Sequence, residues 1–317
     1  MIKNKRAFEF SFSWLFAIIM GAVIIFLAIY AANKFIGTER AKQDTELGKE
    51  LGIILLPIET DLETAKTSKI SFPFETRLYN DCISSNVFGS QKISTATKSG
   101  IGNAWENPGF ASTFYNKYIF SEKILEGKDY FVFSKPFEMP FKIASLIYLW
   151  PKDEQFCFVA PPNEIQEEIT DLQLENIFID NCPPKAKKVC FTGSGCDIDV
   201  NLLGSSSEIR GSLKRKYSNK VYFETTALFY GAIFAEPEIY ECQVKRLMKR
   251  ASELSLIYYT KSTLLSPKGC SSNLESSLIY YANQTFSINN SLDLISYISQ
   301  DSDSLRRRNN DLDCKLF

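Results

Sequence analysis

The 317-residue sequence contains no histidine. Histidine serves as the general base in Ser-His-Asp and Cys-His catalysis, and its imidazole is a common ligand of zinc and haem. The absence of histidine therefore excludes Ser-His-Asp catalysis, Cys-His catalysis, and zinc or haem sites with histidine ligands. An enzyme built from this chain would have to work with carboxylates, Lys, Tyr, Ser or Cys.

The sequence also lacks a Cys-x-x-Cys pair and an imbalance of charge. The tightest cysteine group is Cys182, Cys190 and Cys196, and its spacings differ from those of zinc knuckles. The 36 basic and 37 acidic residues leave a net charge of -1, which gives no long-range attraction toward nucleic acid. We therefore expect neither a cofactor nor a nucleic-acid partner.

A long apolar run near the N-terminus dominates what is present. From Phe10 to Asn33 no residue is charged. About 24 residues at 1.5 Å each span about 36 Å, more than the hydrocarbon core of about 30 Å. Trp14 and Tyr30 lie near its two ends, where amphipathic rings prefer the membrane interface. A cleaved secretory signal has a shorter apolar core, so the run predicts an uncleaved single-pass anchor in the cell membrane.

Small residues are spaced along this run. Ala17 and Gly21 are four residues apart, as are Ala28 and Ala32. Such spacing allows a second helix to approach closely in lipid, so the partners we expect are membrane lipid and another copy of this helix. The same residues also fit the ordinary composition of a membrane helix.

Helical periodicity continues beyond the membrane. Leu47, Leu51, Ile54 and Leu55 fall on one helical face, and Pro57 ends the pattern. This predicts an amphipathic stalk that packs on a soluble domain. The expected parts are a basic leader at 1–9, a transmembrane helix at 10–36, the stalk at 37–57 and an α+β soluble domain at 58–317.

The N-terminus carries Lys5-Arg6-Ala7-Phe8-Glu9 directly before the apolar helix. It resembles the start of type IV pilin-like proteins, and also archaeal single-pass membrane-anchored proteins of unknown function. The pilin resemblance implies cleavage between Ala7 and Phe8, followed by a helix that is half anchor and half core of a head domain. Glu9 would then be the second residue of the mature chain, whereas the family usually places its Glu fifth. The resemblance covers about the first 55 residues.

The eight cysteines are an even number, which is typical of disulfides in an exported domain. Cys182, Cys190 and Cys196 would staple irregular chain around two prolines. Cys270 and Cys314 flank the last helical region and form one expected pair. Disulfides place the C-terminal domain outside the cytoplasm, and two glycosylation sequons, at Asn283 and Asn289, are compatible with this location. Buried free thiols are the alternative.

The soluble domain is expected to place its strands first and its helices last, which predicts an α+β fold with a mixed sheet. Pro73 limits a strand at Ile70–Glu75 to a sheet edge. The stretch 84–120, rich in Ser, Thr, Gly and Asn, is expected to form long loops. Pro237 suits the first turn of a helix with one apolar stripe. The other expected strands are Tyr130–Ser134, Ala144–Trp150, Gln155–Ala160, Asn176–Asp180, Lys187–Thr192, Asp197–Leu203, Glu208–Leu213 and Lys220–Glu224, and the other helices are Asn163–Leu174, Asn273–Asn283 and Ser291–Arg308.

Two clusters could carry chemistry. Asp197 and Asp199 are two residues apart on an expected strand, so their carboxylates would share a face and could bind a cation or act as an acid–base pair. A strand with one solvated face also explains them, and we prefer this interpretation. The second cluster lies largely away from the apolar stripe of its helix, where it would meet an anionic ligand or simply solvent. It comprises Lys245, Arg246, Lys249 and Arg250.

These features predict a membrane-anchored extracytoplasmic protein with a structural or binding role, such as a pilin-like subunit. The alternative is a membrane-tethered hydrolase that uses carboxylates. No sequence motif identifies a catalytic residue.

Overall fold

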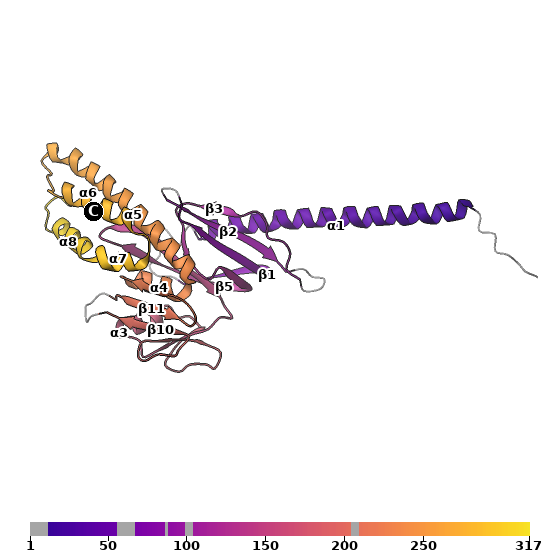
Figure 1. Ribbon diagram of the computed structural model, residues 1–317, viewed down its shortest axis with the longest axis horizontal. Helices are drawn as coiled ribbons and strands as arrows, with labels where there is room; N and C mark the ends of the chain where they lie inside the picture. The colour runs from indigo at the N-terminus through magenta and orange to yellow at the C-terminus, as the bar shows by residue number, and fades with distance from the viewer. Residues whose placement is uncertain (1–11, 56–66, 86–87, 99–103, 204–208) are drawn as a thin grey trace, which may run out of the picture.

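The computed structural model describes residues 12–55, 67–85, 88–98, 104–203 and 209–317. One long helix, α1 (Phe12–Ile54), projects from one side of a head that holds the other described elements (Figure 1). The head contains two six-stranded sheets and a group of C-terminal helices. The molecule is therefore α+β with an apolar N-terminal helix, as the sequence predicts.

Sheet 1 has the strand order β3-β2-β1-β5-β6-β4, and all neighbours are antiparallel except β4 and β6. Its strands are β1 (Ser68–Ile83), β2 (Ser90–Thr97), β3 (Ser112–Phe114), β4 (Tyr118–Phe120), β5 (Ile124–Glu138) and β6 (Lys142–Pro151).

The expectation that Pro73 confines its strand to an edge is wrong, because β1 lies between β2 and β5. The register of β1 against β5 shifts between Ser71 and Thr76, and Pro73 falls inside this irregular stretch. A proline is tolerated there because the ladder is already interrupted.

The expectation of long loops over 84–120 is also wrong, because β2, β3 and β4 lie within it. The buried positions of β2 include Ser90, Gln91 and Thr95, all of which are polar. A strand that buries polar side chains shows no alternation of apolar and polar residues, and this alternation is the signal from which strands are recognised.

Sheet 2 has the order β12-β11-β10-β9-β7-β8. Strands β7, β8, β9 and β10 pair in parallel, and helix α3 (Asn163–Asp171) connects β7 to β8. Strands β11 and β12 extend the sheet in antiparallel fashion. The bounds are β7 (Phe156–Val159), β8 (Ile177–Ile179), β9 (Lys187–Cys190), β10 (Ile198–Leu202), β11 (Gly211–Arg215) and β12 (Lys220–Phe223).

The remaining helices follow β12. Pro237 opens the longest of them, as predicted. The expected helix Ser291–Arg308 is divided at Ile298 into two. Helix α4 was not predicted, because residues 227–234 are all buried and no polar face reveals a period. The helices are α4 (Thr226–Phe234), α5 (Pro237–Leu265), the 3-10 turn η1 (Ser266–Lys268), α6 (Glu275–Ser287), α7 (Ser291–Tyr297) and α8 (Ser299–Asn310).

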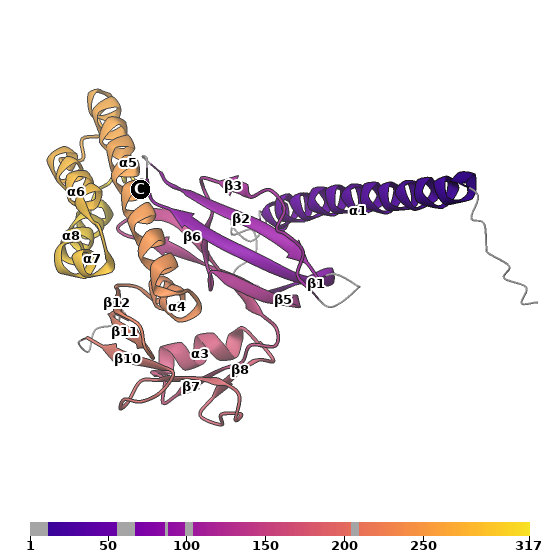
Figure 2. The same ribbon diagram turned by 45° about the vertical axis from the view of Figure 1, so that its right-hand side comes forward.

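Sheet 1 separates two hydrophobic cores. Successive residues on β5 and β6 alternate between them, since Val132 and Leu149 enter one core while Phe133 and Trp150 enter the other. The smaller core, which we call the anchor core, also contains Leu51 and Leu55 of α1. The larger core lies on the opposite face, under α4 and α5, and continues into sheet 2 (Figure 2).

Candidate functional site: the anchor helix and the head it enters

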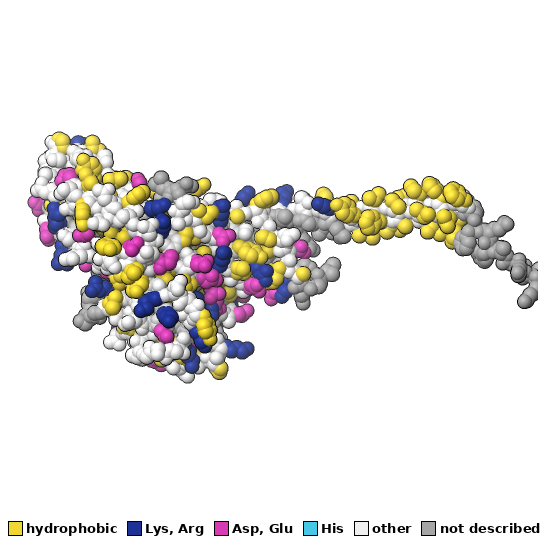
Figure 3. Space-filling view, in the orientation of Figure 1, with side chains coloured by type: hydrophobic (Ala, Val, Ile, Leu, Met, Phe, Trp, Pro, Cys, Tyr) yellow, Lys and Arg dark blue, Asp and Glu magenta, His cyan; other side chains and the backbone are white. Residues whose placement is uncertain are grey.

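The first part of α1, from Phe12 to Ala32, is long and apolar enough to cross a membrane, and none of that window is buried in the protein. Hydrophobic side chains coat this projecting segment (Figure 3). Soluble monomers rarely expose a contiguous apolar surface of this size, and this agrees with a helix that crosses a membrane. It is the one such helix among the described residues.

The small residues of this segment remain open. Ala17, Ala28 and Ala32 are exposed, and a side chain added at Gly21 would meet nothing within 4 Å. The predicted processing site, Ala7 and Phe8, lies outside the described residues. Packing of a second helix on the small residues and cleavage at Ala7 therefore stay predictions.

The second part of α1 enters the head without a break in the helix. Leu51 and Leu55 are 1% and 0% exposed in the anchor core. The Thr95 hydroxyl of β2 donates to the Asp44 carbonyl at 2.6 Å, and the Phe110 amide donates to Thr45 Oγ1 at 3.0 Å. The helix is therefore built into the head by packing and by hydrogen bonds from two neighbouring segments.

Two glycines allow this close approach. A side chain at Gly48 would lie 3.6 Å from the Ile93 carbonyl of β2, which is ordinary van der Waals contact. At Gly52 an added Cβ would overlap the Phe114 ring of β3. Glycine at 52 thus lets the helix lie against β3, and this explains why a residue that weakens an isolated helix occurs there.

A buried polar network fastens α5 to β1, β2 and β4 of sheet 1. The Gln243 amide donates to Gln91 Oε1 and to the Ile119 carbonyl, and the Gln91 amide donates to Asn80 Oδ1. All three side chains are buried. A buried network with its groups bonded fixes one arrangement of the elements that contribute to it.

Arg246 adjoins this network and is fully buried, so the expectation that it meets solvent or an anionic ligand is wrong. Its guanidinium donates to the carbonyls of Phe88, Tyr115 and Lys117 at 2.9–3.2 Å, and to Gln243 Oε1 at 2.8 Å. Burial lowers the pKa of Arg246 to about 10. The side chain holds three carbonyls of irregular chain against α5.

Four disulfides join the eight cysteines. Cys270 is bonded to Cys314, the pair that flanks the last helical region, with Cα atoms 5.8 Å apart. The other three candidate cysteines lie in two short-range bridges of sheet 2, Cys157–Cys182 and Cys190–Cys196. The bridge with the longest sequence separation, Cys82–Cys242, joins the end of β1 to α5.

The structure places Asp197 just before β10 and Asp199 within it. Asp197 Oδ2 accepts from the Lys188 amide at 2.9 Å, while the Asp199 carboxylate accepts from the amides of Gly195 and Cys196 at 3.2 and 3.1 Å. The Asp197 carboxylate therefore binds the backbone of β9, and the Asp199 carboxylate binds the turn before β10. Within the described ranges no group of three or more Asp, Glu or Cys side chains is arranged to hold a metal ion.

A second charged cluster joins the two sheets. Lys187 of β9 forms ion pairs with Glu122, which follows β4, at 2.7 Å, and with Glu154, which precedes β7. Arg215 of β11 lies 3.5 Å from Glu122 and donates to the Ile233 carbonyl of α4. Burial raises the pKa of Glu154, and Lys187 opposes this shift. Two carboxylates and two cations balance in charge, and their contacts connect the chain after β4 of sheet 1 with β9 and β11 of sheet 2.

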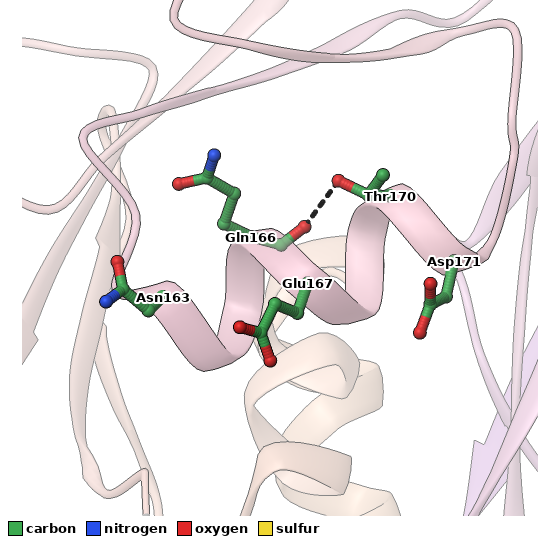
Figure 4. A pocket seen from close by; sticks show the side chains of 5 residues that line it. All are labelled: Asn163, Gln166, Glu167, Thr170 and Asp171. Atoms are coloured by element: carbon green, nitrogen blue, oxygen red, sulfur yellow. Dashed lines mark hydrogen bonds between the residues drawn. The ribbon is translucent and has the colours of Figure 1, made fainter.

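The hollows of the head are shallow and polar. One follows the exposed side of α3, where the side chains are spread along the helix and the Thr170 hydroxyl donates to the Gln166 carbonyl (Figure 4). Asn163, Glu167 and Asp171 complete its described lining and do not converge on a common point. A second hollow lies between α6 and α8. Neither brings together a nucleophile, a base and an oxyanion donor.

The most specific feature of this molecule is therefore the passage of one helix from an apolar span into a protein core. The geometry of this passage, rather than a catalytic cluster, is the candidate functional site. No protein-family model, curated protein or solved structure matches this chain.

Proposed function

We propose that this chain is a membrane-anchored extracytoplasmic protein with a structural or binding role. The observation that carries the proposal is the continuity of α1, whose apolar first part is uncovered and whose second part belongs to the anchor core. An uncovered apolar helix is stable in lipid and not in water. The head is therefore held at the membrane by one of its own core elements.

The four disulfides support a head outside the cytoplasm, because such bonds persist in oxidising compartments and are rare in the cytosol. Two of them close short segments of sheet 2, and two fasten α5 and the C-terminal end. The proposed topology has the N-terminus in the cytoplasm and the head on the outer side.

The bonding partners of the carboxylates favour a structural or binding role over hydrolysis. Asp197 and Asp199 are engaged by backbone amides, and Glu122 and Glu154 by Lys187. Carboxylates that accept from backbone amides or pair with a lysine already have structural partners, and this supports a structural role for all four.

The pilin-like form of the proposal rests on the shared plan of a helix that is half anchor and half core. Under it, the mature chain begins at Phe8 and the small residues Ala17 and Gly21 face a neighbouring helix. Mass mapping of the N-terminus of membrane-purified protein tests this form. An intact Met1 would reject processing and leave anchoring in place.

Carbonate extraction of membranes tests the anchoring itself. The full chain should stay in the pellet without detergent and enter the supernatant with it. Release by carbonate alone would overturn the proposed function.

A further inference from the structure

The strands next to α1 run along its axis toward the apolar span. Gly48 lies opposite the Ile93 carbonyl, and the Asp44 carbonyl is bonded to Thr95. Two strand residues cover about 6.6 Å and four helix residues cover about 6 Å. The two contacts are therefore about equally far apart on β2 and on α1. In Figure 1, β1 and β2 run obliquely to α1, toward the side of the head from which α1 projects.

This register gives the height of the sheet end above the membrane. Lys98 is three residues beyond Thr95, about 10 Å farther along, and forms a bridge with Trp105. Ten ångströms correspond to about seven helix residues, which places Trp105 at the level of residue 37. The uncharged run ends at Asn33, about 6 Å lower. The headgroup layer beyond the hydrocarbon is about 5–8 Å thick, so Trp105 lies at its outer part.

Aromatic side chains gather at this end. Trp105 is half-buried, with the Arg77 guanidinium 4.4 Å and the Lys98 ammonium 5.7 Å from its ring centroid. Phe74 lies in the irregular part of β1, two residues before the Thr76–Thr97 pair, and is 56% exposed. Aromatic rings that combine an apolar body with cationic neighbours suit the membrane–water interface.

We propose that this end of sheet 1 rests in the lipid headgroup layer of the bilayer that α1 spans, with Trp105 and Phe74 as its contacts. The proposal rests on the anchoring described above. The head then has two attachments to the membrane, one through α1 and one through the sheet, and its orientation relative to the bilayer is fixed.

The charges at this end indicate which lipid is needed. Arg77 pairs with Glu126 and Lys98 pairs with Glu75, so cations and carboxylates balance. A balanced surface gains nothing from anionic headgroups. The contact should therefore form on phosphatidylcholine alone and should persist at high salt.

Fluorescence quenching of the full chain in phosphatidylcholine vesicles tests the proposal. The sequence has three tryptophans: Trp14 in the span, Trp105, and Trp150, which is 1% exposed. In the Trp14→Phe variant, a nitroxide on the lipid headgroup should quench Trp105. The loss of emission is measured in Trp14→Phe and in Trp14→Phe/Trp105→Phe. The difference between the two losses is the contribution of Trp105.

A matched control uses Phe110, which is exposed and whose amide donates to Thr45 Oγ1 of α1. Position 110 lies about 12 Å farther from the span than position 105. Phe110→Trp in the Trp14→Phe/Trp105→Phe background should lose less emission than Trp105 does in Trp14→Phe. Equal losses at the two positions, or no loss at Trp105, would overturn the proposal.

The anchor has its own readout in the same vesicles. A nitroxide on the acyl chain should quench Trp14 in the wild-type chain and in Trp105→Phe. If Trp14 is quenched and Trp105 is not, the lipid contact is rejected while the proposed function stands. If Trp14 is not quenched, the anchoring fails, and the lipid contact fails with it.

Discussion

The two halves of α1 occupy different surroundings although the helix is continuous. From Phe12 to Ala32 no residue is buried in the protein, and apolar residues occur on all sides of the helix. From Asp44 onward the exposed positions are mostly polar, while Leu51 and Leu55 are buried. The comparison teaches that a helix in lipid requires only that its residues be uncharged. A helix in a protein core requires apolar residues on one face and small residues where a neighbouring element comes close.

The largest expected effect comes from charging the first half. Val23→Arg/Leu27→Arg places two cations in the centre of the span, at a cost of about 5–7 kcal/mol for insertion. The double variant should appear in the carbonate supernatant or be degraded. Ile53→Arg, which charges an exposed position of the second half, should stay in the pellet. Retention of the double variant in membranes would remove the distinction between the halves.

The next effect concerns the disulfides of the head, into which the second half of α1 packs. Loss of Cys82–Cys242, which closes a separation of 160 residues, should lower the free energy of unfolding by on the order of 5 kcal/mol. Loss of Cys190–Cys196, with a separation of 6, should cost on the order of 2 kcal/mol. Denaturant unfolding of the paired Cys→Ser variants measures both. Alkylation of all eight cysteines without reductant would show that the head is not oxidised.

A smaller effect separates buried from exposed positions within the second half. Leu55→Ala should cost about 2–5 kcal/mol, because it leaves a cavity in the anchor core. Ile53→Ala, at a position that is 64% exposed, should change the free energy of unfolding by less than about 0.5 kcal/mol. Thermal and denaturant unfolding in micelles compare the two, and equal costs would contradict the assigned packing face.

The smallest effect tests the need for room. Gly48→Ala should raise the free energy of unfolding by up to about 1 kcal/mol, because alanine favours the helix and its Cβ fits. Gly52→Ala gains the same propensity but displaces the Phe114 ring, so it should be less stable than Gly48→Ala by about 1 kcal/mol. If both substitutions stabilise the protein equally, the close approach of α1 to β3 is wrong.

The sequence allowed the parts of the fold with strong local signals to be predicted. The span follows from the lack of charge between Phe10 and Asn33, and α5 follows from Pro237 and one apolar stripe. Helix α4 was missed because it is buried on all sides. Strand β2 was missed because Gln91 and Thr95 bury polar groups that bond to segments far away in the chain.

The candidate site depends even more on distant contacts. The continuity of α1 could be anticipated from Leu47, Leu51, Ile54 and Leu55, although Ile54 is exposed in the structure. Gly48 and Gly52 weaken an isolated helix, and only their neighbours in β2 and β3 explain why they occur there. The proposed level of Trp105 in the headgroup layer depends on the register between β2 and α1. Sequence spacing does not encode that register, because 51 residues separate Asp44 from Thr95.

The direction of β2 and β3 beside α1 has a mechanical consequence. A pull on the head along the anchor axis acts parallel to these strands, so the contacts at Asp44, Thr45 and Leu51 are loaded in shear. Contacts loaded in shear resist together, whereas contacts that are peeled apart fail one at a time. The Cys82–Cys242 bridge passes the load from β1 to α5 through a covalent bond. The contacts between α1 and the head therefore share a load applied along that helix.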